Sequence, residues 1–405
     1  MKRILILLLL PFIAYATLTF ESNYKKELEV LHSFDIDASF LHDPVMNQMK
    51  EAKRSKYQHK HFFQAMDEAY LFIPMIKSIM ADKGLPAEFL FLAMAESNFS
   101  TRAYSKKKAA GLWQFMPYTG KLYGLKINDY VDERRDLIKS TKAATKYLSY
   151  LHKRFGKWYL AAIAYNCGGG RLSKGIKRAG TDDLTVLLDP DKKYIPRESR
   201  LYIRKIVALA LLGSDESFLI EQEYGFLLNR ANAYSISTVK VPRGEQLSRV
   251  AKILHMPKKD LVKLNRHLKY DFVPPHDSYY DIHIPYIKLS EFKQNYKPRK
   301  MEQIYIVHTV TAGDNLSYIG KKYGIRYRAI KDFNNLKSDR LSLKQKLIIP
   351  IVKPSKNDNK AYVVKQGDTL ESIANLYKLS VKELKNKNGL TSSLIRIGAK
   401  LTIYD

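Results

Sequence analysis

The sequence is poor in cysteine, and this absence limits the chemistry that the chain can perform. Among 405 residues there is a single cysteine, Cys167. One thiol cannot form an internal disulfide, and it excludes a metal site built on the spacing of paired cysteines. No histidine accompanies Cys167 in the surrounding motif, so we interpret it as a small buried residue rather than a nucleophile.

The sequence also lacks an apolar run long enough to span a bilayer with ease. The apolar segment Ile4–Ala14 is short and is interrupted by Pro11. It follows two basic residues and precedes the small-x-small pattern Ala14-Tyr15-Ala16, so we predict that residues 1–16 are a cleaved export signal. Apolar character persists to Phe20, which keeps an uncleaved anchor as the alternative. We therefore expect the periplasm or cell envelope, with membrane association through the N-terminus left open.

Acidic residues are few relative to basic ones. Lysine and arginine number 69 against 40 acidic residues, giving a formal net charge of +29. Such a charge suits nucleic acid, anionic lipid, an acidic polymer or simply a solvated basic surface. The sequence has no zinc-ligand spacing, no RNA-binding aromatic signature and no basic heptads. We therefore expect no nucleic-acid partner, and we expect neither a cofactor nor a metal.

The most informative stretch is residues 86–166, which begins with PAEFLFLAMAESNF. A helix from about Pro86 to Asn98 would be apolar nearly all round and hence buried. Glu96 would lie near its C-terminal end, where lost hydration and the helix dipole both raise the pKa of a carboxyl group. A raised pKa suits a general acid near neutral pH. The alternative is that Glu96 caps a neighbour or pairs with an arginine such as Arg102.

Short motifs follow Glu96-Ser97 in a fixed order: Ala103-x-Ser105, GLWQFMP at 111–117 and Ala164-Tyr165-Asn166. In order and spacing this set resembles the motifs of the lytic transglycosylases, which have a goose-lysozyme-like catalytic domain and cleave peptidoglycan. The form GLWQFMP, with YGL at 123–125 and YIPRESRLY at 194–202, is most similar to the membrane-bound lytic murein transglycosylase D group.

The resemblance implies cleavage of the β-1,4 bond between N-acetylmuramic acid and N-acetylglucosamine without water. Glu96 would first donate a proton to the glycosidic oxygen and then, as a carboxylate, take the proton of the C6 hydroxyl. That oxygen would close a 1,6-anhydro ring. One carboxyl group suffices in this scheme because the substrate's own N-acetyl group supports the anomeric carbon.

The resemblance also assigns supporting roles by motif position. The residues concerned are Ser105, Gln114, Phe115, Met116, Tyr165 and Asn166. The first two would hold N-acetyl or hydroxyl groups, the next two would form an apolar wall, Tyr165 would orient Glu96 by a hydrogen bond and Asn166 would line the cleft. By residue type alone, Tyr165 and Met116 could equally be core, and Gln114 a satisfied buried amide.

Two other functions remain open for this region. A hydrolytic muramidase on the same fold would need a second carboxylate to place water, and four acidic residues are available: Asp129, Asp132, Glu133 and Asp136. A non-catalytic scaffold that binds the cell wall is the other alternative, although such a protein should have lost Glu96 or its partner residues.

Helical patterns predict a mainly α catalytic domain of lysozyme-like fold over 70–215. The predicted helices are 70–83, 139–152, 158–166 and 197–212, with loop and short helix over 100–125. The glycines 168–170 should end a helix and form a flexible loop, since the group usually has Gly-Glu-Gly there and this chain has Gly169. The N-terminal extension 17–69 is polar, and we expect its HKHFF segment (His59 and His61) at the surface rather than on a metal.

The C-terminal part contains repeats. TAGDNLSYIGKKYGI (311–325) and KQGDTLESIANLYKL (365–379) align without gaps, and each predicts a βααβ order in which the aspartate after glycine can cap a helix. These small α+β modules, 304–351 and 361–405, resemble LysM domains, which bind glycans that contain N-acetylglucosamine. The resemblance places candidate glycan-binding residues at Gly313, Asp314, Asn334, Gly367, Asp368 and Asn388.

A third, degenerate copy is predicted over 236–286, since VPRGEQLSRVAKILHMPKKDLVKLNRHL keeps the spacing from Leu247 to Asn265. The basic polar stretches 288–303 and 353–360 are predicted to be linkers. The LysM resemblance implies that the partner of the whole chain is peptidoglycan glycan strands. Two small domains of another use are the alternative.

Overall fold

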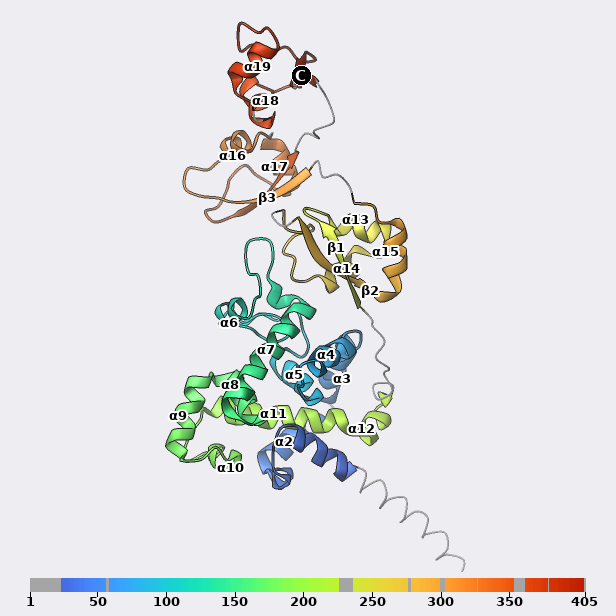
Figure 1. Cartoon of the computed structure of the whole chain (residues 1–405), viewed down its shortest axis with the longest axis vertical. Coiled ribbons are helices and arrows are strands. Elements are labelled where there is room, and N and C mark those ends of the chain that lie inside the picture. The colour runs from blue at the N-terminus through green and yellow to red at the C-terminus, as the bar shows by residue number, and fades with distance from the viewer. Residues whose placement is uncertain are drawn as a thin grey trace, which may run out of the picture. The chain divides into compact units, whose positions relative to one another are not determined.

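The computed structural model of the chain describes residues 23–55, 58–225, 236–275, 278–298, 303–325, 327–352, 361–377 and 379–403 (Figure 1). The predicted export signal and the predicted linker 353–360 lie outside these residues. The chain divides into two compact units. The first comprises Met1–Asn128, Asp132–Ser237 and Pro285–Ile287, and the second comprises Asp129–Val131, Thr238–Ile284 and Lys288–Asp405.

The first unit is helical, as predicted. Its helices include η1 (Ala38–His42), α2 (Pro44–Arg54), α3 (Gln58–Ala69), α4 (Ile73–Ala81), η2 (Ala87–Phe89), α5 (Leu90–Ser97), α6 (Pro117–Leu122), η3 (Glu133–Arg135), α7 (Leu137–Phe155), α8 (Trp158–Cys167), α9 (Gly169–Ala179), α10 (Leu184–Leu187), α11 (Arg197–Ser214) and α12 (Glu216–Glu221). Among the residues that the structure describes, no helix combines the length and the apolar character needed to cross a membrane.

Helix α11 is the central element of this unit. It contacts α2, α5 and α8 (Figure 1). Its apolar run from Ile206 to Leu212 is buried throughout. Gly213 lets α5 approach closely, because a β-carbon there would overlap the ring of Phe91. The helix that carries Glu96 therefore packs directly against α11.

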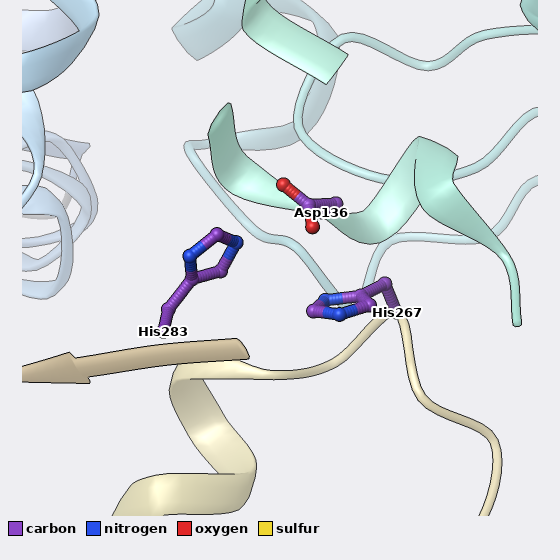
Figure 2. A group of neighbouring side chains, drawn as sticks. All are labelled: Asp136, His267 and His283. Carbon is purple, nitrogen blue, oxygen red and sulfur yellow. The ribbon is translucent and has the colours of Figure 1, made fainter. Parts of the chain in front are cut away.

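Helix α7 shows how local sequence sets the ends of these helices. Its N-cap is Asp136, labelled in Figure 2, whose Oδ1 accepts the backbone N–H groups of Ile138 and Lys139 at 3.0 and 2.8 Å. The helix ends at Gly156, which adopts a left-handed φ of 78°. Both signals lie in the sequence, and they extend the predicted helix 139–152 to Leu137–Phe155.

The N-terminal extension is part of this core, and the prediction of a polar surface stretch is wrong. Leu31, Phe34 and Phe63 are completely or almost completely buried, and the Phe34 and Phe89 ring centroids are 5.2 Å apart. The extension is polar on average, but its apolar residues recur at helical spacing and face inward. Within the HKHFF segment the side chain of His61 is exposed and the two phenylalanines are buried.

The predicted flexible loop at 168–170 is also wrong. Gly168 has a φ of 86° and ends α8, but α9 begins at once with Gly169. The Gly169 carbonyl already accepts a hydrogen bond of 2.9 Å from Ser173 Oγ, one turn ahead. One left-handed glycine is enough to turn the chain from one helix into the next.

The GLWQFMP segment is held in place by the buried side chain of Arg134. Its Nη1 donates to the carbonyls of Lys108 and Phe115 at 2.6 and 2.9 Å, while Asp132 accepts from its Nε and Nη2. Gly111 has a φ of 78°, and a β-carbon there would collide with the carbonyl oxygen of Arg134. The segment can approach Arg134 this closely only with glycine at position 111.

The second unit contains three βααβ modules, as predicted. Their elements are β1 (Ile236–Pro242), α13 (Leu247–Ile253), α14 (Lys258–Leu264) and β2 (Tyr279–Pro285); β3 (Gln303–Thr309), α16 (Leu316–Tyr323), α17 (Tyr327–Phe333) and β4 (Lys346–Val352); β5 (Ala361–Val363), α18 (Leu370–Tyr377), α19 (Val381–Lys387) and β6 (Lys400–Thr402). Each module has a two-stranded sheet, and the β3–β4 and β5–β6 pairs are antiparallel.

One asparagine in each module joins the second helix to the last strand. Asn334 donates from Nδ2 to the carbonyls of Ile330 and Ile348 and accepts the N–H of Ile348. Asn388 and Asn265 make the same three bonds at the equivalent positions of their modules. The repeat of this residue in the sequence thus has a folding role.

The predicted helix-capping role of the aspartates is wrong. Helix α16 is capped by Asn315, whose Oδ1 accepts the Tyr318 N–H at 2.8 Å. Asp314 instead closes the strand-to-helix turn by accepting from the backbone and hydroxyl of Thr311 and from His308. These bonds lower the pKa of Asp314 to about 2. Asp368 makes the corresponding turn bond to the Lys365 N–H at 2.7 Å.

The third module is larger than predicted. Residues 289–295, predicted as linker, form α15 (Leu289–Asn295), and Phe292 is buried in the core of the module. The same module carries two buried histidines, His267 after α14 and His283 on β2 (Figure 2), with ring centroids 5.5 Å apart. The module therefore continues beyond residue 286 and includes α15.

We predict that Gly111→Ala destabilises the first unit by about 3 kcal/mol or more, because strain at positive φ is joined by a backbone collision. Gly124→Ala is the matched control, since Gly124 has a φ of 88° and nothing within 4 Å of a β-carbon. We expect it to destabilise by only about 1 kcal/mol. Both tryptophans of the chain, Trp113 and Trp158, lie in this unit, so denaturation followed by tryptophan fluorescence reports on it alone. Equal losses in the two variants would contradict the account of Gly111.

Candidate active site

Glu96 lies in the last turn of α5, as the sequence predicts. Residues Leu90–Met94 of this helix are buried, and Asn98 ends it with a left-handed φ of 49° while its N–H bonds the Met94 carbonyl. Ser97 Oγ donates to the carbonyl of Leu112 at 2.7 Å. This bond ties the end of the helix to the GLWQFMP segment.

The partner of Glu96 is a tyrosine from α11 rather than Arg102. Tyr202 donates from its hydroxyl to Glu96 Oε1 at 2.5 Å. One turn further along α11, Lys205 Nζ donates to the carbonyl of Ala95 at 2.6 Å. Glu96 is thus approached from α11 by one neutral donor and one positive charge.

Burial controls the protonation of Glu96. Loss of hydration raises the pKa of its carboxyl group from 4.5 to about 7, against the opposing effects of the Tyr202 hydrogen bond and the charge of Lys205; the negative charge of Glu198 adds to the rise. The expected raised pKa is confirmed. Burial also raises the pKa of Tyr202 well above its usual value, so its hydroxyl stays protonated and remains a donor.

Glu96 lines a cavity of about 460 Å³. Side chains from α2, α5, α8 and α11 form its walls: Met49, Ala52, Lys53, Ala95, Glu96, Asn166, Glu198, Leu201, Tyr202, Lys205, Ala208 and Leu209. Apolar and small side chains supply about half of the lining residues, and Tyr202 is the lining residue that bonds the Glu96 carboxyl group. Such a pocket, with few polar groups on an apolar surface, is typical of a ligand site.

Tyr165 does not make the predicted hydrogen bond to Glu96. Its hydroxyl donates to the carbonyl of Trp113 at 2.7 Å, and its ring lies 6.2 Å from that of Phe115, centroid to centroid. Ser97 and Tyr165 therefore hold two consecutive carbonyls, those of Leu112 and Trp113. Tyr165 lies on α8, where its hydroxyl meets the GLWQFMP segment, whereas Tyr202 lies on α11, which packs against α5 and its Glu96.

The remaining predicted residues divide between the cavity and the GLWQFMP segment. Asn166 lines the cavity with Glu96, and its Oδ1 accepts a 2.6 Å bond from Ser199 Oγ. Gln114 has a φ of 47°, a strained conformation for a non-glycine residue, and its amide donates to the Gly111 carbonyl at 2.8 Å. Ser105 Oγ accepts the Ala109 N–H at 3.0 Å. Backbone strain such as that at Gln114 is frequent at ligand-binding and active sites.

Phe115 and Met116, predicted to form one apolar wall, differ in exposure. Phe115 is 2% exposed and packs against the rings of both Tyr147 and Tyr165, so it belongs to the core. Met116 is 44% exposed and is free to contact a ligand.

The acidic residues considered for a hydrolase are used elsewhere in the fold. Asp132 pairs with Arg134 at 2.7 Å, Glu133 pairs with Lys139 at 2.6 Å, and Asp136 caps α7. Asp129 belongs to the second unit. The second carboxylate at the cavity is Glu198, which is exposed and which the sequence motifs did not single out.

Sequence reasoning missed three further residues of the cavity. Tyr202 and Lys205 lie in or just after the YIPRESRLY segment, which was recognised as a motif without a role for either side chain. Lys53 comes from α2, in the extension that was treated as surface. The apolar spacing of the extension was the signal that could have placed it in the fold.

We predict that Glu96→Gln stabilises the first unit near pH 8 and has little effect near pH 4. The carboxyl holds its proton up to about pH 7 in the folded chain but only to about 4.5 when unfolded, so stability falls as the pH rises between these values. Glutamine removes this penalty, which is at most about 3 kcal/mol. Thermal unfolding followed by tryptophan fluorescence measures the difference, with Glu88→Gln on η2 as the control for loss of a carboxyl group elsewhere. A stabilisation independent of pH would contradict the burial of an ionisable Glu96.

Family models match most of the described chain. Residues 74–186 match the transglycosylase SLT domain, residues 308–350 and 362–403 match the LysM domain, and residues 235–300 match the LysM-like domain described as that of lytic transglycosylase MltD. The match to 300 includes α15, in agreement with the packing of Phe292.

Individual relatives match over long and short stretches. The chain is 27% identical over 387 residues to the membrane-bound lytic murein transglycosylase D of Escherichia coli (strain K12), which covers 89% of this chain and 82% of the relative. It is 42% identical over 113 residues to a putative tributyltin chloride resistance protein of Alteromonas sp. (strain M-1), over 28% of this chain and 54% of that one. Among solved structures, the 70 kDa soluble lytic transglycosylase of Escherichia coli aligns with 36% of this chain and 24% of its own, with 23% identity and a TM-score of 0.29.

Proposed function

The chain belongs to the lytic transglycosylases that join a transglycosylase SLT domain to LysM domains, and from this premise we propose how its residues carry out the reaction. The reaction is cleavage of the β-1,4 bond between N-acetylmuramic acid and N-acetylglucosamine of peptidoglycan, with a 1,6-anhydro-muramic product. LysM modules hold the enzyme on the glycan.

The observation that supports this chemistry best is the state of Glu96. A carboxyl group with a pKa of about 7 is present in both protonation states near neutral pH, so it can give a proton and later take one back. Tyr202 occupies Oε1, which leaves Oε2 for the substrate. In the first step the Oε2 proton passes to the glycosidic oxygen, and the C–O bond to the leaving sugar breaks.

The second step uses the same atom. The carboxylate takes the proton of the C6 hydroxyl, and the C6 oxygen bonds to the anomeric carbon, which the neighbouring N-acetyl group has supported meanwhile. Lys205 and Tyr202 stabilise the carboxylate between the steps, because both favour the charged form of Glu96. We assign to Gln114 and Ser105 the positioning of substrate polar groups, to Asn166 a place in the cleft and to Met116 an apolar contact.

A hydrolytic muramidase is the second candidate, and one observation favours it. Glu198 is a second carboxylate at the cavity, and a carboxylate at a suitable separation could place a water molecule. The identity of the product end separates the two reactions.

The LysM modules are proposed to contact glycan through the turns after their first strands. Gly313 and Gly367 adopt left-handed φ angles of 88° and 87° in these turns, and nothing lies within 4 Å of a β-carbon at either position, so the backbone is open to a sugar. Asp314 and Asp368 shape the same turns, while Asn334 and Asn388 act through the fold. The net charge of +29 suits a polymer that carries carboxylates.

We propose that the protein acts in the cell envelope, after export to the periplasm. Its predicted N-terminal signal and its glycan-binding modules support this location, and the relative from Escherichia coli is described as membrane-bound. Membrane association through the N-terminus is part of the same proposal.

We predict that the full chain without residues 1–16 releases muropeptides lighter by one water than the corresponding reducing muropeptides from purified sacculi. Glu96→Gln should lower this rate by about a thousandfold or more, because it removes the only proton donor and acceptor of the scheme. Mass spectrometry of the released products is the measurement, with Glu88→Gln on η2 as a control for carboxyl loss elsewhere.

Reducing-end products would replace the lyase by the hydrolase and make Glu198 the residue to test. Binding to sacculi without any product would contradict both enzymatic schemes and would leave a wall-binding scaffold.

We predict that Tyr202→Phe moves the alkaline limb of the kcat/KM profile to higher pH. The Tyr202 hydrogen bond lowers the pKa of Glu96, so its loss lets the acid form persist to higher pH. The maximal rate should fall about tenfold or more, since the carboxylate intermediate loses a donor. Tyr165→Phe is the matched control: its hydroxyl bonds the Trp113 carbonyl, so activity should fall without this shift. An identical shift in both variants would contradict the assignment of Tyr202 as the hydrogen-bond donor that lowers the pKa of Glu96.

A further inference from the structure

Helix α11 carries two side chains that hydrogen-bond to different walls of the Glu96 cavity. Tyr202 donates to Glu96 Oε1 at 2.5 Å. Three residues earlier, Ser199 donates from its hydroxyl to Asn166 Oδ1 at 2.6 Å. Residues three apart lie on the same side of a helix. One face of α11 therefore reaches both the carboxyl group on α5 and the side-chain amide on α8.

Asn166 lines the cavity, whereas Ser199 does not. Asn166 is the penultimate residue of α8, is partly exposed and shares the cavity wall with Glu96. Ser199 is 0% exposed and is not one of the lining residues. Any effect of the Ser199 hydroxyl on a ligand in the cavity therefore passes through Asn166.

The geometry of this bond indicates which atom of the Asn166 amide faces Ser199. A separation of 2.6 Å is ordinary for an O–H···O bond and short for an N–H···O bond, so the hydroxyl meets the amide oxygen. The Cys167 thiol also lies beside this hydroxyl; burial raises the pKa of the thiol, against a hydrogen bond from Ser199 that lowers it. Because a neutral thiol is a weak acceptor, the single proton of Ser199 goes to Asn166.

The amide nitrogen of Asn166 then remains for the cavity. It carries two N–H donors, and within the described residues no hydrogen bond uses Nδ2 of Asn166. About half of the residues around it are apolar or small. An unpaired donor on such a wall costs free energy, which a ligand oxygen would recover.

We propose that Ser199 is a positioning residue, which orients Asn166 so that its amide N–H groups donate to an N-acetyl carbonyl oxygen of the glycan that Glu96 cleaves. This assignment rests on the proposed function. A sugar hydroxyl can both donate and accept, so it would tolerate either orientation of the amide. A carbonyl oxygen only accepts, and it therefore requires the N–H end that Ser199 turns toward the cavity.

The test is a double-mutant cycle in the full chain without residues 1–16, measured as the rate of release of anhydro-muropeptides from purified sacculi. We expect Asn166→Ala to lower this rate about tenfold and Ser199→Ala about fivefold, the effect of losing one hydrogen bond each. Since Ser199 acts through Asn166, the double variant should be no slower than Asn166→Ala alone. Losses that multiply to about fiftyfold would overturn the inference, because Ser199 would then act independently of Asn166. A Ser199→Ala variant as fast as the native chain would overturn it as well.

Two further measurements test the donor role. Asn166→Asp keeps the size of the side chain but places an oxygen where Nδ2 lies, so its rate should fall at least as far as that of Asn166→Ala. An aspartate variant with the native rate would contradict a donor at this position. Ser199→Ala should leave the alkaline limb of the pH profile in place, because Ser199 bonds Asn166 and not Glu96. A shift like that expected for Tyr202→Phe would mean that Ser199 acts through Glu96 and would also overturn the inference.

Ser140→Ala is the matched control. Ser140 on α7 is likewise 0% exposed, and in the part of the chain that the structure describes its hydroxyl has no hydrogen-bond partner, so the rate should stay as it is. Tryptophan fluorescence melts verify that the variants are folded. If the native chain releases no anhydro products, the proposed function fails before any variant is compared, and the two failures are thus distinguishable.

Discussion

The dehydration of one carboxyl group is the constraint on which this site depends. Glu96 lies in the last turn of a short helix whose preceding residues are all apolar, so folding this helix into the core removes much of the hydration of the carboxyl group. Burial alone would hold the pKa of the group still higher and favour its neutral form. Tyr202 and Lys205 restore part of the lost solvation, and the balance places the pKa at about 7, where one group can serve as acid and then as base.

A single helix, α11, supplies the groups that oppose the effect of burial on the pKa of Glu96. Along α11, Tyr202 donates to Glu96, Lys205 donates to the carbonyl next to it, and Arg204 anchors α2 through Asp43. Gly213 removes the side chain that would hold α5 away. The GLWQFMP segment, by contrast, is positioned by Arg134, Ser97 and Tyr165 through its backbone carbonyls. The GLWQFMP segment and the carboxyl group on α5 therefore have different partners, and Ser97 at the end of α5 links the two.

The sequence predicted what depends on local pattern and on motifs. The buried helix, the raised pKa of Glu96 and the βααβ order of the modules follow from apolar spacing and from the repeats. Sequence analysis failed where the interacting residue is far away in the chain, or where the average composition of a segment conceals its buried apolar residues. Tyr202 lies 106 positions from Glu96, so no spacing rule separates it from Tyr165 as the partner. The extension is polar in composition, which hid the buried Phe34 and Phe63. The LysM resemblance placed Asn334 and Asn388 among the candidate glycan-binding residues, and a repeat in the sequence does not reveal that their side chains also join a helix to a strand.

The most direct test of this account is the pKa of Glu96 itself. It can be measured by NMR from the side-chain carboxyl carbon of selectively labelled glutamate, with the Glu96→Gln variant identifying the resonance. We expect a midpoint of about 7, well separated from those of exposed glutamates. A midpoint near 4.5 would show that the carboxyl group is solvated and ionised at neutral pH, and a single residue acting first as acid could not then be the centre of the reaction.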